Sequence, residues 1–148
     1  MCGGVQFDHH GKTLKTYFPN PNARLPVLTR NGSCVLIPWG RREQQPGLTP
    51  QGGWARRESI QQGSWQRFQP RPVKIAVDAF MEKDQEGNSC WYPLETGQFI
   101  QGLVATDAAF IRIYVVTEES EHSHHKTNRW PRLITDPSAP TVESSRLF

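Results

Sequence analysis

The chain has 148 residues, a length that fits one domain, and 36% of them are hydrophobic. A mean hydropathy of -0.62, together with 12 prolines and 12 glycines, favours short elements joined by turns and argues against a helical bundle. The formal net charge of +3 permits a nucleic-acid partner without requiring one.

In chain order, the predicted elements are mostly short strands. Asn31-Gly32 between two apolar runs predicts a hairpin, and 41–53 and 84–89 predict an exposed loop and a polar turn. Residues 57–68 predict an irregular helix with Ile60 and Phe68 facing inward. Extended runs of β-forming residues predict strands at 16–18, 25–29, 34–37, 73–77, 91–94, 99–105 and 110–117.

These elements predict an α+β, mostly β fold with one or two short helices. The architecture is either a compact, partly closed barrel or two packed sheets. We expect a single domain over 1–135, followed by a flexible C-terminal tail over 136–148 that lacks periodicity.

The three cysteines are Cys2, Cys34 and Cys90. An odd count without a close pair argues against a disulfide framework and for a reducing compartment. No apolar run reaches membrane-spanning length, and the first residues carry no secretory pattern. We therefore expect a cytoplasmic protein that does not interact with membranes.

Arginines and tryptophans crowd the stretch from residue 39 to residue 71. Arginine supplies phosphate contacts and an aromatic face stacks on a base, so this stretch suits a nucleic-acid surface. A solvated loop region with half-buried tryptophans is an equally good interpretation. The residues are Trp39, Arg41, Arg42, Trp54, Arg56, Arg57, Trp65, Arg67 and Arg71.

Cysteine at position 2 has a specific chemical consequence. Removal of Met1 would leave an α-amine beside the Cys2 thiol, both partly available as nucleophiles at neutral pH. Such a 1,2-aminothiol condenses with an aldehyde to a thiazolidine, and an abasic site in DNA is partly a ring-opened aldehyde. The plain alternative is an ordinary frayed terminus.

The opening Met1-Cys2-Gly3-Gly4 resembles the Met-Cys-Gly-Arg start of the SOS response-associated peptidase family, the abasic-site-processing proteins. Residues 54–58 resemble its Asn-Ala-Arg-x-Glu motif, and residues 77–82 are similar to its Ala-Asp-Gly-Phe-Tyr-Glu motif. Four more segments fall in family order, so the resemblance spans nearly the whole of a chain that is short for the family. They are 25–28, 36–40, 100–103 and 127–134.

The resemblance implies a DNA-damage protein that binds single-stranded DNA and captures abasic sites covalently. Cys2 would be the nucleophile, and Glu82 would shuttle protons, unless it is merely a surface charge at a strand end. Self-removal of Met1 and a lyase activity are also implied, without a cofactor or metal, and we expect a monomer. The residues that the resemblance assigns to DNA binding are Pro38, Trp39, Trp54, Arg56, Arg57 and Arg129; for Trp39 a core aromatic is the alternative.

Three positions depart from the family pattern: Gly4 replaces an arginine, Trp54 an asparagine and Thr127 a histidine. His125 or His124 lies close enough in sequence to substitute for that histidine as an acid or base. A module that binds DNA without linking to it is therefore the main alternative function. Gel mobility under denaturing conditions separates the two.

A third hypothesis is metal binding. Histidines gather with glutamates just after the last predicted strand, and histidine clusters hold zinc. However, the run has no second ligand pair at a fixed distance, so we expect no metal site. The residues are Glu118, Glu119, Glu121, His122, His124 and His125.

Overall fold

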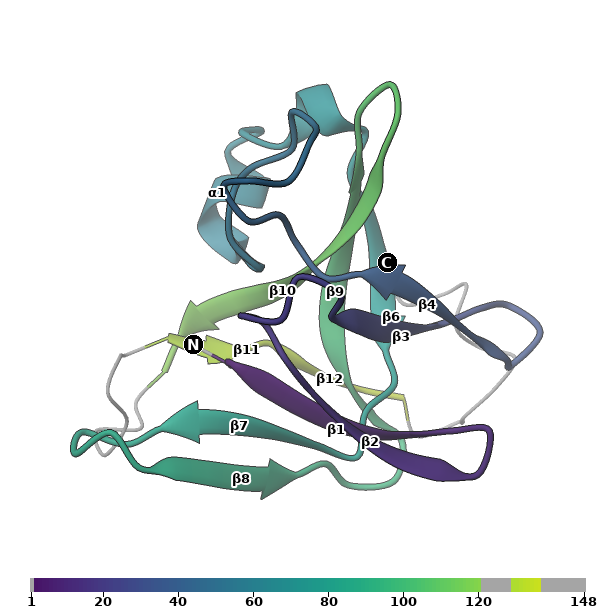
Figure 1. Cartoon of the computed structure of the whole chain (residues 1–148), viewed down its shortest axis with the longest axis vertical. Coiled ribbons are helices and arrows are strands. Elements are labelled where there is room, and N and C mark those ends of the chain that lie inside the picture. Colours follow the sequence, from purple (N-terminus) through teal and green to yellow (C-terminus); the bar gives the residue numbers. More distant parts are fainter. Residues whose placement is uncertain (1, 121–128, 137–148) are drawn as a thin grey trace.

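The computed structural model describes residues 2–120 and 129–136. Across these residues the protein is mostly β, with two sheets, one α-helix and one 3₁₀ turn (Figure 1). This confirms the predicted fold class and the small helical content.

The smaller sheet has four antiparallel strands in the order β2–β1–β7–β8, at the bottom of Figure 1. The polar turn predicted between β7 and β8 is present, because the Asp84 carboxylate accepts the backbone N–H of Glu86 and Asn88 at 2.9 and 2.8 Å. The strands β1 and β7 were not predicted. The bounds are β1 (Gly4–His9), β2 (Lys12–Tyr17), β7 (Ala79–Lys83) and β8 (Ser89–Pro93).

The larger sheet has the path β11–β10–β9–β6–β3–β4. Antiparallel pairing of β3 with β4 confirms the predicted hairpin, whose turn is held by Asn31 Oδ1 accepting from the Ser33 backbone at 3.1 Å. Its members on this path are β3 (Arg24–Leu28), β4 (Cys34–Pro38), β6 (Arg71–Ile75), β9 (Gln98–Thr106), β10 (Ile111–Glu119) and β11 (Arg129–Pro131).

Two short strands complete this sheet. β5 (Trp54–Arg56) runs parallel to β10, and β12 (Leu133–Thr135) pairs with β9. The sheet also curls, so that Trp39, just after β4, forms an isolated bridge to Ile113 of β10. One bridge is not a ladder, and the sheet built by the described residues is not a closed barrel.

The main core lies between the two sheets, where Val5, Phe80, Ile100 and Val115 are buried. A second cluster lies on the other side of the larger sheet, under α1 (Arg57–Gln61) and the 3₁₀ turn η1 (Gln66–Phe68). The members of this second cluster are Ala55, Trp65, Phe68, Leu103, Ala105, Tyr114 and Val116, with Ile60 packed against them.

The predicted helix over 57–68 is broken in the structure. Its inward residues Ile60 and Phe68 were predicted correctly, but Gly63 adopts a φ of 85° and separates α1 from η1. A left-handed residue inside a helix breaks the ladder of hydrogen bonds, and glycine adopts that conformation at little cost. The result is two short turns instead of one continuous helix.

The segment 41–53 is less exposed than predicted. Arg41 and Gly52 pair as an isolated bridge, and Thr49 is fully buried. The Arg41 Nε donates to the Thr49 carbonyl at 2.6 Å, so a hydrogen bond within the segment stabilises its conformation. Composition predicted a solvated loop, whereas the chain uses its arginines as internal hydrogen-bond donors.

Ordered structure reaches the first residue of the predicted tail. The Lys74 ammonium and the Asp136 carboxylate form a buried ion pair at 2.8 Å. The rest of that predicted tail, 137–148, lies outside the described residues. Within the described part of the chain, no helix is both long and apolar enough to cross a membrane.

Candidate functional site

Cys2 lies at the start of the smaller sheet, directly before β1. Its side chain is fully buried, and its thiol donates to the Gly4 carbonyl at 3.3 Å. The backbone next to it is fixed, because the Gly3 N–H donates to the Met81 carbonyl at 3.1 Å. The frayed terminus that served as the alternative interpretation does not describe Cys2.

Glu82 lies on β7, in the same sheet that begins just after Cys2. It follows Met81 on β7, the strand that pairs with β1, and only 1% of the residue is exposed. Its charge acts directly on the Cys2 thiol: burial raises the pKa of Cys2 to about 12, and the negative charge of Glu82 adds to that rise. Burial also raises the pKa of the Glu82 carboxyl above its usual value. A surface charge at a strand end is therefore the wrong description of Glu82.

A pocket of about 420 Å³ opens beside Cys2, lined mainly by apolar groups. We call it the N-terminal pocket. Its volume lies within the range of small-molecule sites. Its wall includes Gly3, the residue next to the thiol-bearing one, and Lys83, the residue after the buried glutamate. The full lining is Gly3, Tyr17, Phe18, Pro19, Trp54, Met81, Lys83 and Ser89.

Trp54 joins the pocket to Cys2. Its indole Nε1 donates to the Cys2 carbonyl at 2.7 Å, and its ring packs against Phe18 with centroids 4.9 Å apart. A tryptophan here cannot accept a hydrogen bond, but it supplies one donor that fixes the Cys2 backbone. The asparagine position of the family motif is thus occupied by a group that still contacts the cysteine.

Gly4, where the family motif has an arginine, lies under an aromatic ring. A Cβ at this position would lie 2.8 Å from Cδ1 of Tyr17, closer than carbon atoms approach without a shift. Register explains the contact, since Gly4 and Tyr17 are direct partners in the β1–β2 ladder. The absence of a side chain at Gly4 and the position of the Tyr17 ring therefore belong to the same local arrangement.

Pro38 and Trp39 differ sharply from each other. Pro38 is exposed at the end of β4, whereas Trp39 is fully buried and its indole donates to the Gly53 carbonyl at 3.0 Å. With no exposed ring face, Trp39 has no surface on which a base stacks in this structure. The core-aromatic alternative describes Trp39.

Arg129 is buried and makes several hydrogen bonds. Its guanidinium forms a bidentate pair with the Glu58 carboxylate at 2.8 and 3.0 Å and donates to the Thr117 carbonyl at 2.8 Å. These hydrogen bonds from Arg129 hold the pKa of Glu58 at about 2. Arg57 pairs with Glu118 at 3.3 Å, and Arg56 is exposed. Two of these three arginines, Arg57 and Arg129, are therefore paired with carboxylates of the protein itself.

His125 and Thr127 lie outside the described residues, as do the three histidines of the metal hypothesis. Among the residues that the structure describes, no cluster of three histidine, cysteine or acidic side chains has metal-binding geometry. The three cysteines are not joined by disulfides.

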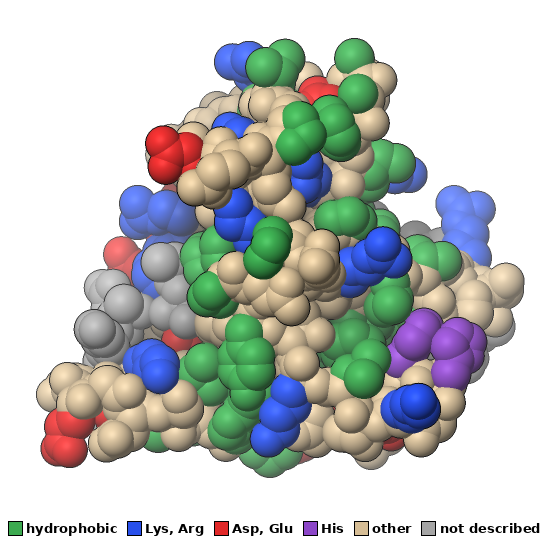
Figure 2. All heavy atoms as spheres, in the orientation of Figure 1, with side chains coloured by type: hydrophobic (Ala, Val, Ile, Leu, Met, Phe, Trp, Pro, Cys, Tyr) green, Lys and Arg blue, Asp and Glu red, His purple; other side chains and the backbone are tan. Residues whose placement is uncertain are grey.

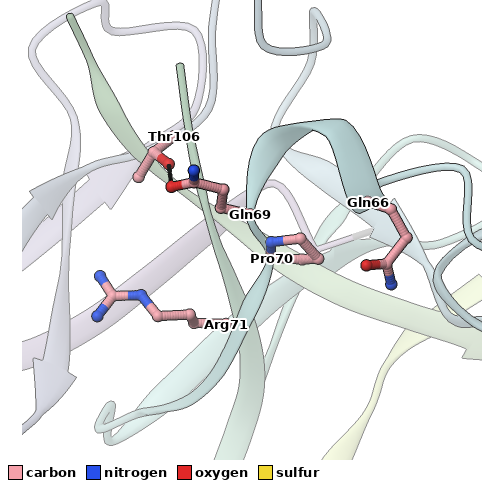
Figure 3. A pocket seen from close by; sticks show the side chains of 5 residues that line it. All are labelled: Gln66, Gln69, Pro70, Arg71 and Thr106. Carbon is pink, nitrogen blue, oxygen red and sulfur yellow. Dashed lines mark hydrogen bonds between the residues drawn. The ribbon is translucent and has the colours of Figure 1, made fainter. Parts of the chain in front are cut away.

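A second depression lies away from Cys2, beside η1 and the start of β6 (Figure 3). It is polar, with Thr106 donating to the Gln69 side chain at 3.3 Å and Arg71 pointing away from both. None of its lining residues contributes to the N-terminal pocket. Its lining holds no thiol, imidazole or carboxylate, so it lacks the pairing of groups found at Cys2.

Comparison with known proteins identifies no relative: no family model, curated protein or solved structure matches the chain. The family resemblance stays a prediction from motifs. The motifs predicted Cys2, Glu82 and one lining residue of the pocket, Trp54. They did not predict the lining residues Tyr17, Phe18 and Lys83. Their only signal was register, since Tyr17 and Met81 are both partners of Gly4, and register is not visible before strands β1 and β7 are known.

Proposed function

We propose that this protein captures abasic sites in single-stranded DNA through a thiazolidine formed by Cys2. The observation that carries the proposal is the burial of the Cys2 thiol and the Glu82 carboxylate in one electrostatically coupled pair beside an open pocket. The negative charge of Glu82 disfavours ionisation of the Cys2 thiol, and perturbed pKa values of this kind cluster at functional sites.

The chemistry begins with hydrolysis of the Met1–Cys2 peptide bond by water, which makes the Cys2 nitrogen an α-amine. This amine adds to the C1′ aldehyde of the ring-opened sugar, and loss of one water gives an imine. The Cys2 sulfur then adds to the imine carbon, and the thiol proton ends on the ring nitrogen. One C–N and one C–S bond form, one C=O bond is lost, and one water leaves.

Glu82 suits both proton transfers. Burial raises the pKa of the Glu82 carboxyl toward neutral pH. The protonated carboxyl gives a proton to the departing hydroxyl, and the resulting carboxylate then takes a proton from the thiol. The thiol needs such a partner, since a pKa of about 12 keeps it protonated at neutral pH. The negative charge of Glu82 also disfavours attack by Cys2 as a free thiolate. It thereby favours the intramolecular addition of the Cys2 sulfur to an imine that has already formed.

The test is a denaturing gel with an oligonucleotide carrying one abasic site. We expect a shifted band that survives heat and detergent, that disappears with Cys2→Ala and that persists with Cys34→Ser, an exposed thiol on β4. Reducing the abasic aldehyde to an alcohol beforehand removes the electrophile and must abolish the band. Intact mass of the purified protein should lack Met1.

Two results would overturn the proposal. One is a band of equal intensity with Cys2→Ala, which would place the linkage elsewhere. The other is salt-sensitive binding in a native gel with no denaturation-resistant band for the Met1-free protein. That second result identifies a DNA-binding module that does not link covalently, in which Trp54 occupies part of the space for the lesion.

A further inference from the structure

The smaller sheet turns one face inward and one face to solvent. Val5, Phe80 and Glu82 are buried on the inner face, so residues of opposite parity on the same strands point outward. Cross-strand register then lines up Tyr17, Gly4, Met81 and Trp91 in one row across all four strands. Lys15 lies two residues before Tyr17, and Lys83 two after Met81, on the same outer face.

Aromatic and basic groups converge on this face. Because Gly4 has no side chain, the Tyr17 ring leans over β1 and lies edge-on to Trp91, with centroids 6.2 Å apart. The Lys15 ammonium lies over the Trp91 ring, 4.8 Å from its centroid. Tyr17 is 42% exposed although its ring contacts that of Trp91. Figure 2 shows hydrophobic side chains interspersed with Lys and Arg over this sheet.

The same face leads directly into the N-terminal pocket. Tyr17, Met81 and Lys83 belong to both, and Lys83 donates to the Ser89 hydroxyl at 2.9 Å at the pocket rim. The nearest outward carboxylate on β1 is Asp8, which accepts the Thr13 hydroxyl at 2.8 Å at the end of the sheet away from Lys83. Lys83 therefore lines the pocket, whereas Asp8 lies at the far end of β1 and the acidic residues Asp84 and Glu86 lie in the β7–β8 turn beyond Lys83.

We infer that this outer face is a stacking surface for unpaired nucleic acid and that it guides the strand flanking a lesion toward Cys2. The inference rests on the proposed function for its orientation, and deepens it by assigning the strand path. Exposed aromatic rings beside ammonium groups bind bases and phosphates without reading sequence. An apolar protein partner fits less well, because it would take the Lys15 and Lys83 ammonium groups out of water.

The experiment measures fluorescence anisotropy of a labelled oligothymidine without a lesion, at several salt concentrations. Tyr17→Leu should weaken binding about 5- to 100-fold through loss of stacking. Lys15→Gln and Lys83→Gln should each weaken binding several-fold, and each should reduce the slope of log K against log salt by about 0.7. Lys12→Gln is the matched control, because Lys12 is exposed on the same strand and alternates to the other face.

Thermal melts establish that each variant folds, and the two lysine variants keep the test valid if Tyr17→Leu does not. Two results overturn the inference. One is a wild-type protein that does not bind oligothymidine, and the other is an affinity that Lys15→Gln and Lys83→Gln change no more than Lys12→Gln does. Cross-linking to an abasic strand separates it from the proposed function. If binding depends on the lysines but no Cys2 adduct forms, the stacking surface is supported and the capture reaction is not. If a Cys2 adduct forms but the lysine variants bind oligothymidine like the wild type, the capture reaction is supported and the stacking surface is not.

Discussion

The two sides of this protein use their cations differently. In the segment 41–71, where arginine is most frequent, Arg41 and Arg42 donate to backbone carbonyls of their own surroundings, including Thr49 and Trp39 at 2.6 Å. The Arg42 guanidinium also lies over the Phe18 ring, 3.9 Å from its centroid. On the smaller sheet, by contrast, Lys15 and Lys83 are exposed. The Lys15 ammonium lies over the Trp91 ring, and the Lys83 ammonium donates to the Ser89 hydroxyl.

Arg56, Arg57, Arg67 and Arg71 of the same segment are exposed, so the local density of arginine overstates, by Arg41 and Arg42, the number of cations available to phosphates. A guanidinium has five N–H donors, and a loop without its own backbone pairing is the place where those donors are needed internally. An ammonium on a flat, paired strand has no such carbonyls to satisfy. The number of uncommitted donors decides which cations are available, and only the tertiary structure reveals that number.

Glu82→Gln should have the largest effect of the variants, on the rate of adduct formation. Such an effect would place the capture reaction at the smaller sheet. A glutamine keeps the shape but transfers no protons, so the rate of adduct formation should fall about 10²- to 10⁴-fold. The rate is measured by quenched time points on denaturing gels with an abasic strand. An unchanged rate would remove Glu82 from the mechanism.

The same variant should be more stable than the wild type at neutral pH. A carboxyl whose folded pKa is raised makes the wild type lose stability as pH rises from the unfolded value of 4.5 through the folded pKa. Glutamine does not ionise, so the Tm of Glu82→Gln should exceed that of the wild type at pH 7, with the gap narrowing toward pH 4.5. A lower Tm at pH 7 would contradict this sign.

Trp39→Ala should affect stability before it affects DNA. Removing a fully buried tryptophan leaves a cavity and should lower the free energy of unfolding by about 3–5 kcal/mol. Urea denaturation followed by circular dichroism measures the change. If the variant instead keeps its stability and loses affinity for oligothymidine, Trp39 is a DNA contact and the comparison between the two sides fails.

Arg129→Gln should cost about 1–3 kcal/mol of stability, because charge-assisted hydrogen bonds to Glu58 and the Thr117 carbonyl are lost. In the wild type the pKa of Glu58 is lowered to about 2, so its stabilising effect is present above 4.5 and is lost as pH falls toward 2. Acid titrations of the two proteins should therefore converge at low pH. Parallel curves would show that the pair does not stabilise the fold.

Arg57→Gln should have the smallest effect. Both partners of the Arg57–Glu118 pair are more than a third exposed, so the loss of stability should stay below about 1 kcal/mol. A salt slope for oligothymidine that falls by about 0.7 in this variant would add the arginine-rich side to the binding surface. An unchanged slope would sharpen the contrast with Lys15 and Lys83.

Local sequence carried much of the fold. The Asn31-Gly32 turn, the polar turn at Asp84 and the run of β-formers in β10 each act through neighbours in the chain, so their structures were predictable. The strand β1 was missed because glycines weaken strand propensity, and it exists through pairing on both sides. The glycine at position 63 indicated an irregular helix. It did not indicate that the segment would divide into two separate turns, α1 and η1.

By itself the sequence determined which groups were available for chemistry: a cysteine at position 2, a glutamate at position 82 and an excess of cations. Only the tertiary structure decided which of them meet and which are occupied, because pairing of β1 with β7 couples Cys2 to Glu82, while packing directs Arg129 and Trp39 inward. Burial and strand register depend on residues distant in the chain, and no local pattern encodes them.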